Sequence, residues 1–126
     1  RIEIKSGVII QQGVHITCAE LVLIGEKTSI GAWVTITDIN HKYKDVNLPI
    51  DAQDIEVKSV VIGKNCKIYN GVVILPGVRI GEHVIIGANS VVTTDIPSFS
   101  VAVGAPARVV KQFNNKTKKW DFLKAR

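Results

Sequence analysis

Residues 62–97 read IGKNCK, IYNGVV, ILPGVR, IGEHVI, IGANSV, VTTDIP, and every block of six opens on an aliphatic residue. A second small or branched residue recurs four places later in each block, from Cys66 to Ile96. A period of six matches neither an isolated α-helix nor one long strand, whose faces repeat every 3.6 and 2 residues. The repeat instead predicts short strands joined by corners and stacked as a parallel β-helix, with three sides to each coil.

The same repeat is present, less regularly, in the preceding part of the chain. Its opening residues there are Ile4, Ile10, Ile16, Ile24, Ile30 and Ile36. The step from Ile16 to Ile24 is eight residues rather than six, which predicts a corner with two extra residues. The predicted fold class is therefore all-β. Each Ile or Val that points inward is expected to contribute about 1.5 to 3 kcal/mol on burial.

Two segments depart from the repeat. Residues 42–57 are polar and have no period, so we predict a loop extruded from a corner; long excursions from compact folds are usually functional, although a tolerated insertion is the alternative. Gly104 and Pro106 predict a turn off the final coil. We divide the chain into a β-helix domain, 1–112, and a basic segment, 113–126, which forms either a short amphipathic helix capping the solenoid or a disordered tail.

Composition sets the broad class of the protein. The 126 residues, 46% of them hydrophobic, suffice for one domain. The net charge of +5 is a mild bias toward anionic ligands, but no aromatic residues are interleaved with the basic ones as in a nucleic-acid-binding face. We find no signal peptide and no apolar span of transmembrane length. Because the chain starts with Arg1 and contains no Met, we expect that it lacks its native start.

The two cysteines, Cys18 and Cys66, lack the spacing of metal ligands. We interpret them as reduced packing residues of a cytoplasmic protein.

The histidines are the first candidates for chemistry. His41 lies where the last regular block meets the polar loop, beside Asp38, and a neutral imidazole is a good general base at neutral pH. A solvated loop histidine is the other interpretation, and the residues alone leave both open. His15 and His83 occupy outward positions of the repeat and are interpreted as surface residues. A zinc-dependent hydratase would need three convergent histidines, which spacings of 26 and 42 residues do not favour, so no metal is predicted.

Three blocks in order, TITDINHKY (35–43), the repeat through VVTTDIP (91–97) and VAVGAPARVVK (101–111), resemble one enzyme family. It is the hexapeptide-repeat O-acetyltransferases of the galactoside and maltose acetyltransferase type, and among them those that acetylate sugars of bacterial surface polysaccharides. The resemblance covers residues 24–111. It implies a left-handed parallel β-helix and a homotrimer that binds acetyl-CoA between subunits. The six-residue period establishes neither property, and the left-handed turn runs against the usual right-handed crossover.

The resemblance also implies roles for particular residues. His41 corresponds to the base that takes the proton from an acceptor sugar hydroxyl, which then attacks the thioester directly, without an acyl-enzyme. A backbone N–H at Asn70 or Gly71 corresponds to the oxyanion donor, and such donors contribute about 10² to 10³ in rate. Asp38 is expected to orient the imidazole, although a backbone carbonyl would serve equally.

The positions that correspond to the acetyl-CoA site lie in the second half of the chain. Ala88 corresponds to the contact with the pantetheine arm, Thr93 and Thr94 to the adenosine side, and Arg108 with Lys111 to the basic residues at the nucleotide phosphates. The guanidinium fork suits phosphate geometry.

Three positions depart from the family pattern. Lys67 and Tyr69 stand where most relatives have Trp and Gly, and Thr94 stands where they have Lys, a loss for which Lys67 or Arg79 is a candidate substitute. The function predicted from these residues is an acetyl-CoA-dependent sugar O-acetyltransferase. The departures support the alternative of a structural or binding β-helix that has lost acetyl-CoA affinity, whereas the presence of His41 supports the enzyme.

Overall fold

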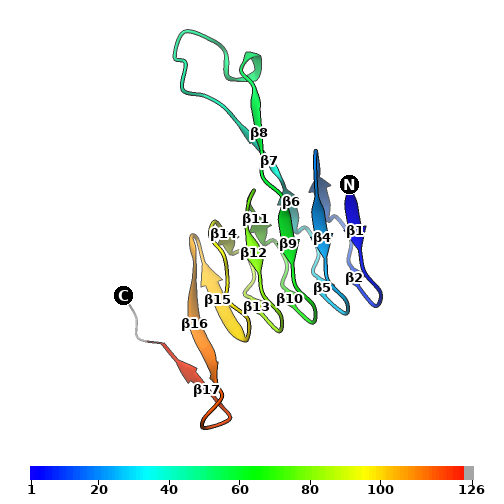
Figure 1. The fold of residues 1–126 in the computed structure, drawn as a ribbon, viewed down its shortest axis with the longest axis vertical. Helices are drawn as coiled ribbons and strands as arrows, with labels where there is room; N and C mark the ends of the chain where they lie inside the picture. The colour runs from blue at the N-terminus through cyan, green and yellow to red at the C-terminus, as the bar shows by residue number, and fades with distance from the viewer. Residues whose placement is uncertain (124–126) are drawn as a thin grey trace.

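Short strands and corners alternate along most of the chain, which winds into a three-sided prism in the computed structural model (Figure 1). The structure describes residues 1–123. Sheet A contains β1 (Ile2–Ile4), β4 (Val22–Ile24), β9 (Val60–Ile62) and β12 (Arg79–Ile80). Sheet B contains β2 (Ile9–Ile10), β5 (Ser29–Ile30), β10 (Lys67–Ile68), β13 (Ile85–Ile86), β15 (Ser100–Gly104), β16 (Ala107–Asn114) and β17 (Lys119–Phe122). Sheet C contains β3 (His15–Thr17), β6 (Thr35–Thr37), β11 (Val73–Ile74) and β14 (Val91–Val92).

The predicted fold class is confirmed: the fold is a left-handed parallel β-helix. Strands of successive coils pair in parallel, and equivalent repeat positions stack, as in the register Ile24↔Ile62 and Ile62↔Ile80 of sheet A. The opening residues of the blocks between residues 62 and 97 are all at most 2% exposed. The six-residue period therefore identified the core correctly, because each side of the prism points one column of aliphatic side chains inward.

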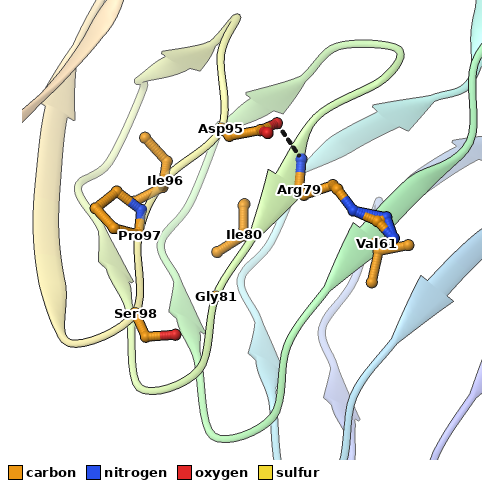
Figure 2. Close-up of a pocket in the computed structure, with 8 residues that line it drawn as sticks. All are labelled: Val61, Arg79, Ile80, Gly81, Asp95, Ile96, Pro97 and Ser98. Carbon is orange, nitrogen blue, oxygen red and sulfur yellow. Dashed lines mark hydrogen bonds between the residues drawn. The ribbon is translucent and has the colours of Figure 1, made fainter.

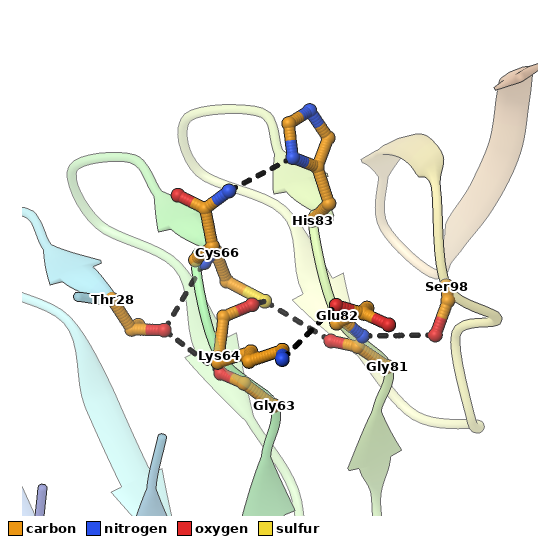
Figure 3. A network of polar contacts seen from close by, with 9 residues as sticks. Thr28, Gly63, Lys64, Cys66, Gly81, Glu82, His83 and Ser98 are labelled. Carbon is orange, nitrogen blue, oxygen red and sulfur yellow. Dashed lines mark hydrogen bonds and ion pairs between the residues drawn. The ribbon is translucent and has the colours of Figure 1, made fainter. Parts of the chain in front are cut away.

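Buried polar groups tie neighbouring coils together at the corner between sheets A and B (Figure 3). The Thr28 hydroxyl donates to the Gly63 carbonyl at 2.8 Å and accepts the Cys66 N–H at 3.1 Å. One coil further on, the Cys66 thiol donates to the Gly81 carbonyl at 3.1 Å. Burial raises the pKa of the Cys66 thiol above its ordinary value of 9.0. Cys18 and Cys66 are both free, and Cys66 packs in the core as expected.

The extruded segment is a β-hairpin rather than only a loop. It begins at β7 (Ile39–His41), which pairs antiparallel with β8 (Ile55–Val57), and the connection between them contains the short 3₁₀ helix η1 (Ile50–Ala52). The prediction of an excursion is confirmed, but its base starts three residues before the predicted segment 42–57. In Figure 1 the hairpin stands well away from the prism.

The C-terminal segment forms strands, so both predictions for it, a helix and a disordered tail, are wrong over the described residues. The chain reverses after Gly104, as predicted, and β16 pairs antiparallel with β15 and then with β17. The predicted domain boundary at residue 113 falls inside β16. An aromatic cluster of Phe99, Phe113, Trp120 and His83 fastens this hairpin to the last coils, with ring centroids 5.6 to 6.4 Å apart.

Residues 124–126, the end of the predicted basic segment, lie outside the described residues. Within residues 1–123, no helix has the length and hydrophobicity that a membrane crossing requires.

Candidate active site

His41 ends strand β7 and lies in a groove of about 620 Å³ on the hairpin. The groove is lined by Asn40, His41, Lys42, Tyr43, Lys44, Gln53 and Glu56. The antiparallel register sets His41 opposite Ile55 and Asn40 opposite Glu56. The His41 side chain is exposed, so its ring nitrogens are accessible to a substrate hydroxyl.

Of the residues that line this groove, the sequence singled out only His41, and Gln53 is the most connected of those it missed. Gln53 organises the hairpin tip: its amide nitrogen donates to the carbonyls of Asp45 and Leu48, and its amide oxygen accepts the Asp45 N–H. These contacts hold together residues that line or support the His41 groove. A single amide inside an aperiodic polar loop carries no pattern, so no signal in the sequence distinguished it.

The predicted role of Asp38 as the residue that orients His41 is not supported by its contacts. Asp38 is fully buried, and its carboxylate accepts the backbone N–H groups of Ala19, Glu20 and Leu21 at 2.8 to 3.0 Å. Burial alone would raise the pKa of Asp38, but these three donors and the Cys18 thiol outweigh it and lower the pKa below 3.8. The carboxylate therefore anchors the corner that contains the two extra residues predicted between Ile16 and Ile24.

Asn70, Gly71 and Ala88 lie together along the corner between sheets B and C, on two successive coils. The Gly71 N–H already donates to the Ala32 carbonyl at 3.0 Å. The Asn70 N–H has no acceptor among residues 1–123, whereas the Asn70 side-chain oxygen accepts the Ala32 N–H at 3.0 Å. Of the two predicted oxyanion donors, Asn70 is thus the one whose backbone N–H has no acceptor among the described residues.

The remaining cofactor positions divide between two places. Thr93 and Thr94 are exposed and follow β14, whereas Ala88 precedes it, so they lie at opposite ends of that strand. Strand registers place Lys67 opposite Ile85, Ile85 opposite Val101, and Val101 opposite Lys111, which makes one row across the outer face of sheet B. This row has a cationic residue at each end and apolar residues between them.

The basic and aromatic residues near this row contact one another. The Lys67 ammonium lies 5.4 Å from the Tyr69 ring centroid, and the Lys111 ammonium lies 4.2 Å from that of Phe122. Arg108 is exposed on β16, where its guanidinium donates to the Ala107 carbonyl at 3.3 Å. Arg108 and Lys111 thus share one strand, and an exposed guanidinium on that strand is free to meet an anionic group.

A second groove, of about 510 Å³, lies on the outer face of sheet A (Figure 2). It forms because the chain after Thr94 makes only a single bridge, Ile80↔Ile96, instead of a full strand. Asp95 accepts the Arg79 N–H at 2.8 Å, and the Arg79 side chain extends over Val61. Arg79 therefore lies on a different face from the Lys67 to Lys111 row of sheet B.

The three histidines do not converge. His15 lies on β3 and contacts the Thr17 hydroxyl at 3.0 Å, and His83 lies at the corner between sheets A and B, where it contacts the Asn65 amide at 2.9 Å. His83 is exposed as predicted, but it also stacks with Phe99 and Trp120. His41 and Asn70 are separated as well: β6 and β7 lead from the sheet B–C corner to His41, so the predicted base and oxyanion donor lie at opposite ends of sheet C.

Comparisons with known proteins agree with this architecture. Residues 59–94 match the family described as bacterial transferase hexapeptide (six repeats). WbbJ of Escherichia coli strain K12, named for O-acetyl transfer in lipopolysaccharide biosynthesis, is 43% identical over an alignment of 115 positions that covers 86% of this chain and 59% of WbbJ. The chain thus spans about three fifths of the length of that relative.

Two solved structures share the fold. A hexapeptide-repeat acetyltransferase from Vibrio cholerae, in complex with acetyl-CoA, superposes with a TM-score of 0.84 at 29% identity, covering 90% of this chain and 61% of that protein. A maltose O-acetyltransferase from Clostridium difficile superposes with a TM-score of 0.68 at 32% identity, covering 91% of this chain and 65% of that protein. Repeat, fold and relatives agree: the chain is a hexapeptide-repeat β-helix that is similar in sequence and in fold to acetyltransferases of the hexapeptide-repeat type.

Proposed function

We propose that this chain is the β-helix of an acetyl-CoA-dependent O-acetyltransferase that acts on a sugar hydroxyl in surface polysaccharide biosynthesis. The observation that carries the proposal is the fold match to an acetyl-CoA-bound acetyltransferase, combined with an exposed His41 in a groove of the extruded hairpin. The name of WbbJ supports a saccharide acceptor, and so does the name of the maltose enzyme.

In this proposal His41 is the general base. It accepts the proton of the acceptor hydroxyl as that oxygen attacks the thioester carbonyl, the carbon–sulfur bond then breaks, and the CoA thiolate leaves and is protonated. The backbone N–H of Asn70 donates to the developing oxyanion, since the N–H of Gly71 is committed to Ala32. No acyl-enzyme is needed.

The acetyl-CoA molecule is proposed to bind along the sheet B–C corner and the outer face of sheet B. An extended chain with a phosphorylated end suits the row from Lys67 through Ile85 and Val101 to Lys111, with Arg108 on the same strand as Lys111. Ala88 lies beside this path, and the Lys67 and Lys111 side chains offset the missing lysine at Thr94.

Because His41 and Asn70 lie at opposite ends of sheet C, we propose that each complete site is built from two copies, in a homotrimer. The hairpin is the element that would reach a neighbouring copy. Its tip exposes large apolar side chains that nothing within residues 1–123 covers, among them Tyr43, Val46, Leu48 and Ile50, which are 50 to 91% exposed. Thr93 and Thr94, remote from Ala88 within one chain, would meet the cofactor across the same interface.

The test is a pair of measurements on the purified protein. Calorimetric titration should show binding of acetyl-CoA and weaker binding of dephospho-CoA, which lacks the 3′-phosphate. His41→Ala should lower transfer to an accepted sugar by about 10² to 10⁴-fold while leaving acetyl-CoA binding intact. His15→Ala, an exposed histidine outside the proposed site, is the matched control and should retain activity.

Undiminished turnover of His41→Ala would move the base to another residue. A folded wild-type protein that binds no acetyl-CoA would instead favour the structural or binding β-helix.

A further inference from the structure

The corner between sheets B and C differs in chemistry from the corner between sheets A and B. Its residues, coil by coil, are 11–13 (QQG), 31–33 (GAW), 69–71 (YNG) and 87–89 (GAN), and none is charged. The equivalent residues at the A–B corner, 5–7 (KSG), 25–27 (GEK), 63–65 (GKN) and 81–83 (GEH), contain lysines and glutamates. We call residues 11–13, 31–33, 69–71 and 87–89 the neutral edge.

Trp33 is the most prominent side chain of the neutral edge. Its backbone has φ of 62°, in the left-handed region that only a few non-glycine residues adopt, and its side chain is 66% exposed. The indole packs on Gly13 of the preceding coil. The contact is so close that a Cβ at Gly13 would collide with the six-membered part of the ring. The first coil therefore supports one side of the ring, and much of the remaining surface faces solvent.

Amide side chains lie on the coils that flank Trp33. Asn70 is fixed by the bond from the Ala32 N–H to its side-chain oxygen, at 3.0 Å, and its side-chain nitrogen has no acceptor among the described residues. The Trp33 N–H donates to the Gln12 carbonyl at 3.0 Å, and the Gln12 side chain is exposed on the coil before Trp33. Asn and Gln amides can both donate and accept, as sugar hydroxyls do.

We propose that the Trp33 end of the neutral edge, residues 11–13 and 31–33, holds the sugar ring of the acceptor, with Trp33 as the stacking platform that selects a neutral hexose. The inference rests on the proposed function. The apolar C–H face of a pyranose suits an indole face, and its hydroxyls suit the flanking amides. No charged residue belongs to residues 11–13 or 31–33, which disfavours acidic sugars there, because a carboxylate or phosphate would lose hydration without gaining a partner on these two coils. The coil of Trp33 is adjacent to the coil of Asn70, at roughly 5 Å, and the indole leans to the other side, over Gly13. A sugar on the ring therefore lies on the N-terminal side of the proposed oxyanion donor.

The direct test uses the fluorescence of Trp33 itself. The 126-residue chain contains only two tryptophans, so Trp120→Phe leaves Trp33 as the sole indole emitter. Titration of this variant with methyl glucoside and methyl galactoside should give a saturable change in emission with at least one of them, whereas glucuronate should give none. Acrylamide should quench the emission before sugar is added and quench it less at saturation.

Two results would overturn the proposal. Emission unchanged by either glycoside would mean that no neutral hexose stacks on the ring. If the emission of the sugar-free protein is blue-shifted and acrylamide does not quench it, Trp33 is shielded from solvent, which would mean that a second copy of the chain covers the edge.

Kinetics give an independent readout. Trp33→Asn removes the indole but keeps a residue that tolerates positive φ, as Asn89 does at φ of 60° on the same edge. It should raise the KM for the accepted glycoside about three- to tenfold, the range of an aromatic contact, and leave the KM for acetyl-CoA unchanged. Trp33→Tyr should restore most of the loss.

Lys27→Asn is the matched control for backbone strain. Lys27 occupies the equivalent place on the A–B corner of the same coil, with φ of 59°, and it covers Gly7 as Trp33 covers Gly13. This variant should leave both KM values unchanged. An unchanged glycoside KM in Trp33→Asn would contradict the proposal. If the wild-type protein transfers no acetyl group at all, the proposed function fails, and the fluorescence titration decides the role of Trp33 by itself.

Discussion

Asp38 shows how much one buried carboxylate can do for a solenoid. Its charge has no cationic partner in the contacts described for residues 1–123; instead three backbone N–H groups of a single corner converge on it. Such charge-assisted bonds are about twice as strong as neutral ones. The result is that the first coil, whose Ile4 and Ile10 are 49 and 40% exposed, is fastened to the second by a polar contact as well as by packing.

Replacement of Asp38 should therefore loosen the first coil. Asp38→Asn keeps one acceptor oxygen but directs an N–H₂ donor toward backbone donors, so the free energy of unfolding should fall by about 1.5 to 3 kcal/mol. Amide hydrogen exchange should accelerate mainly in residues 1–21. Asp95→Asn is the control, because Asp95 is exposed and accepts a single backbone N–H from Arg79. If the amides of the first coil exchange equally slowly in Asp38→Asn and in Asp95→Asn, apolar contacts alone hold the first coil in place.

The same residue predicts a pH dependence. Because folding lowers the pKa of Asp38 below 3.8, its contribution is present above that value and is lost as the pH falls through the lowered pKa. Between pH 5 and pH 3 the wild-type protein should lose unfolding free energy more steeply than Asp38→Asn. Parallel pH profiles of the two proteins would show that Asp38 does not titrate differently on folding.

At the scale of elements, the C-terminal hairpin ends sheet B by antiparallel pairing instead of another coil. The Trp120 ring lies 5.6 Å from Phe113 and 6.0 Å from His83, so side chains from β17, β16 and a corner of the prism meet in one cluster. This cluster, rather than the edge hydrogen bonds alone, holds β17 in place, because a two-stranded hairpin is marginal in water.

Trp120→Ala should release β17 without unfolding the prism. We expect a local loss of about 1 to 3 kcal/mol, seen as faster hydrogen exchange of the β17 amides and of the Leu123 N–H, which donates to the Val110 carbonyl at 2.9 Å. Exchange of the core amides should not change. Phe122→Ala removes an aromatic side chain that is 76% exposed on the same strand and should leave protection nearly intact. Similar exchange in the two variants would mean that backbone pairing alone secures the strand.

For the molecule as a whole, stability depends on the inward columns. Ile85 and Ile86 are neighbours on β13, yet Ile86 is fully buried and Ile85 is 37% exposed. Ile86→Asp places an unpaired charge in the core and should cost more than about 4 kcal/mol, whereas Ile85→Asp should stay within about 1 kcal/mol of wild type.

Chemical denaturation followed by circular dichroism compares the two. If Ile86→Asp does not fold, Ile86→Ala gives the measurable version, with an expected loss of about 2 to 5 kcal/mol. Equal losses for Ile85 and Ile86 would contradict the inward and outward assignment of β13.

The residues alone determined the β-helix and its core, because an aliphatic position every six residues can stack only if each side of a coil points one column inward. They also located the excursion, since the period stops at Ile36 and resumes at Ile62. Only the tertiary structure decided the role of Asp38, the strands after Gly104, the separation of His41 from Asn70 and the exposure of Trp33. Each of these depends on which distant segment lies beside the residue, and such individual contacts, unlike the stacked aliphatic columns, do not repeat in the sequence.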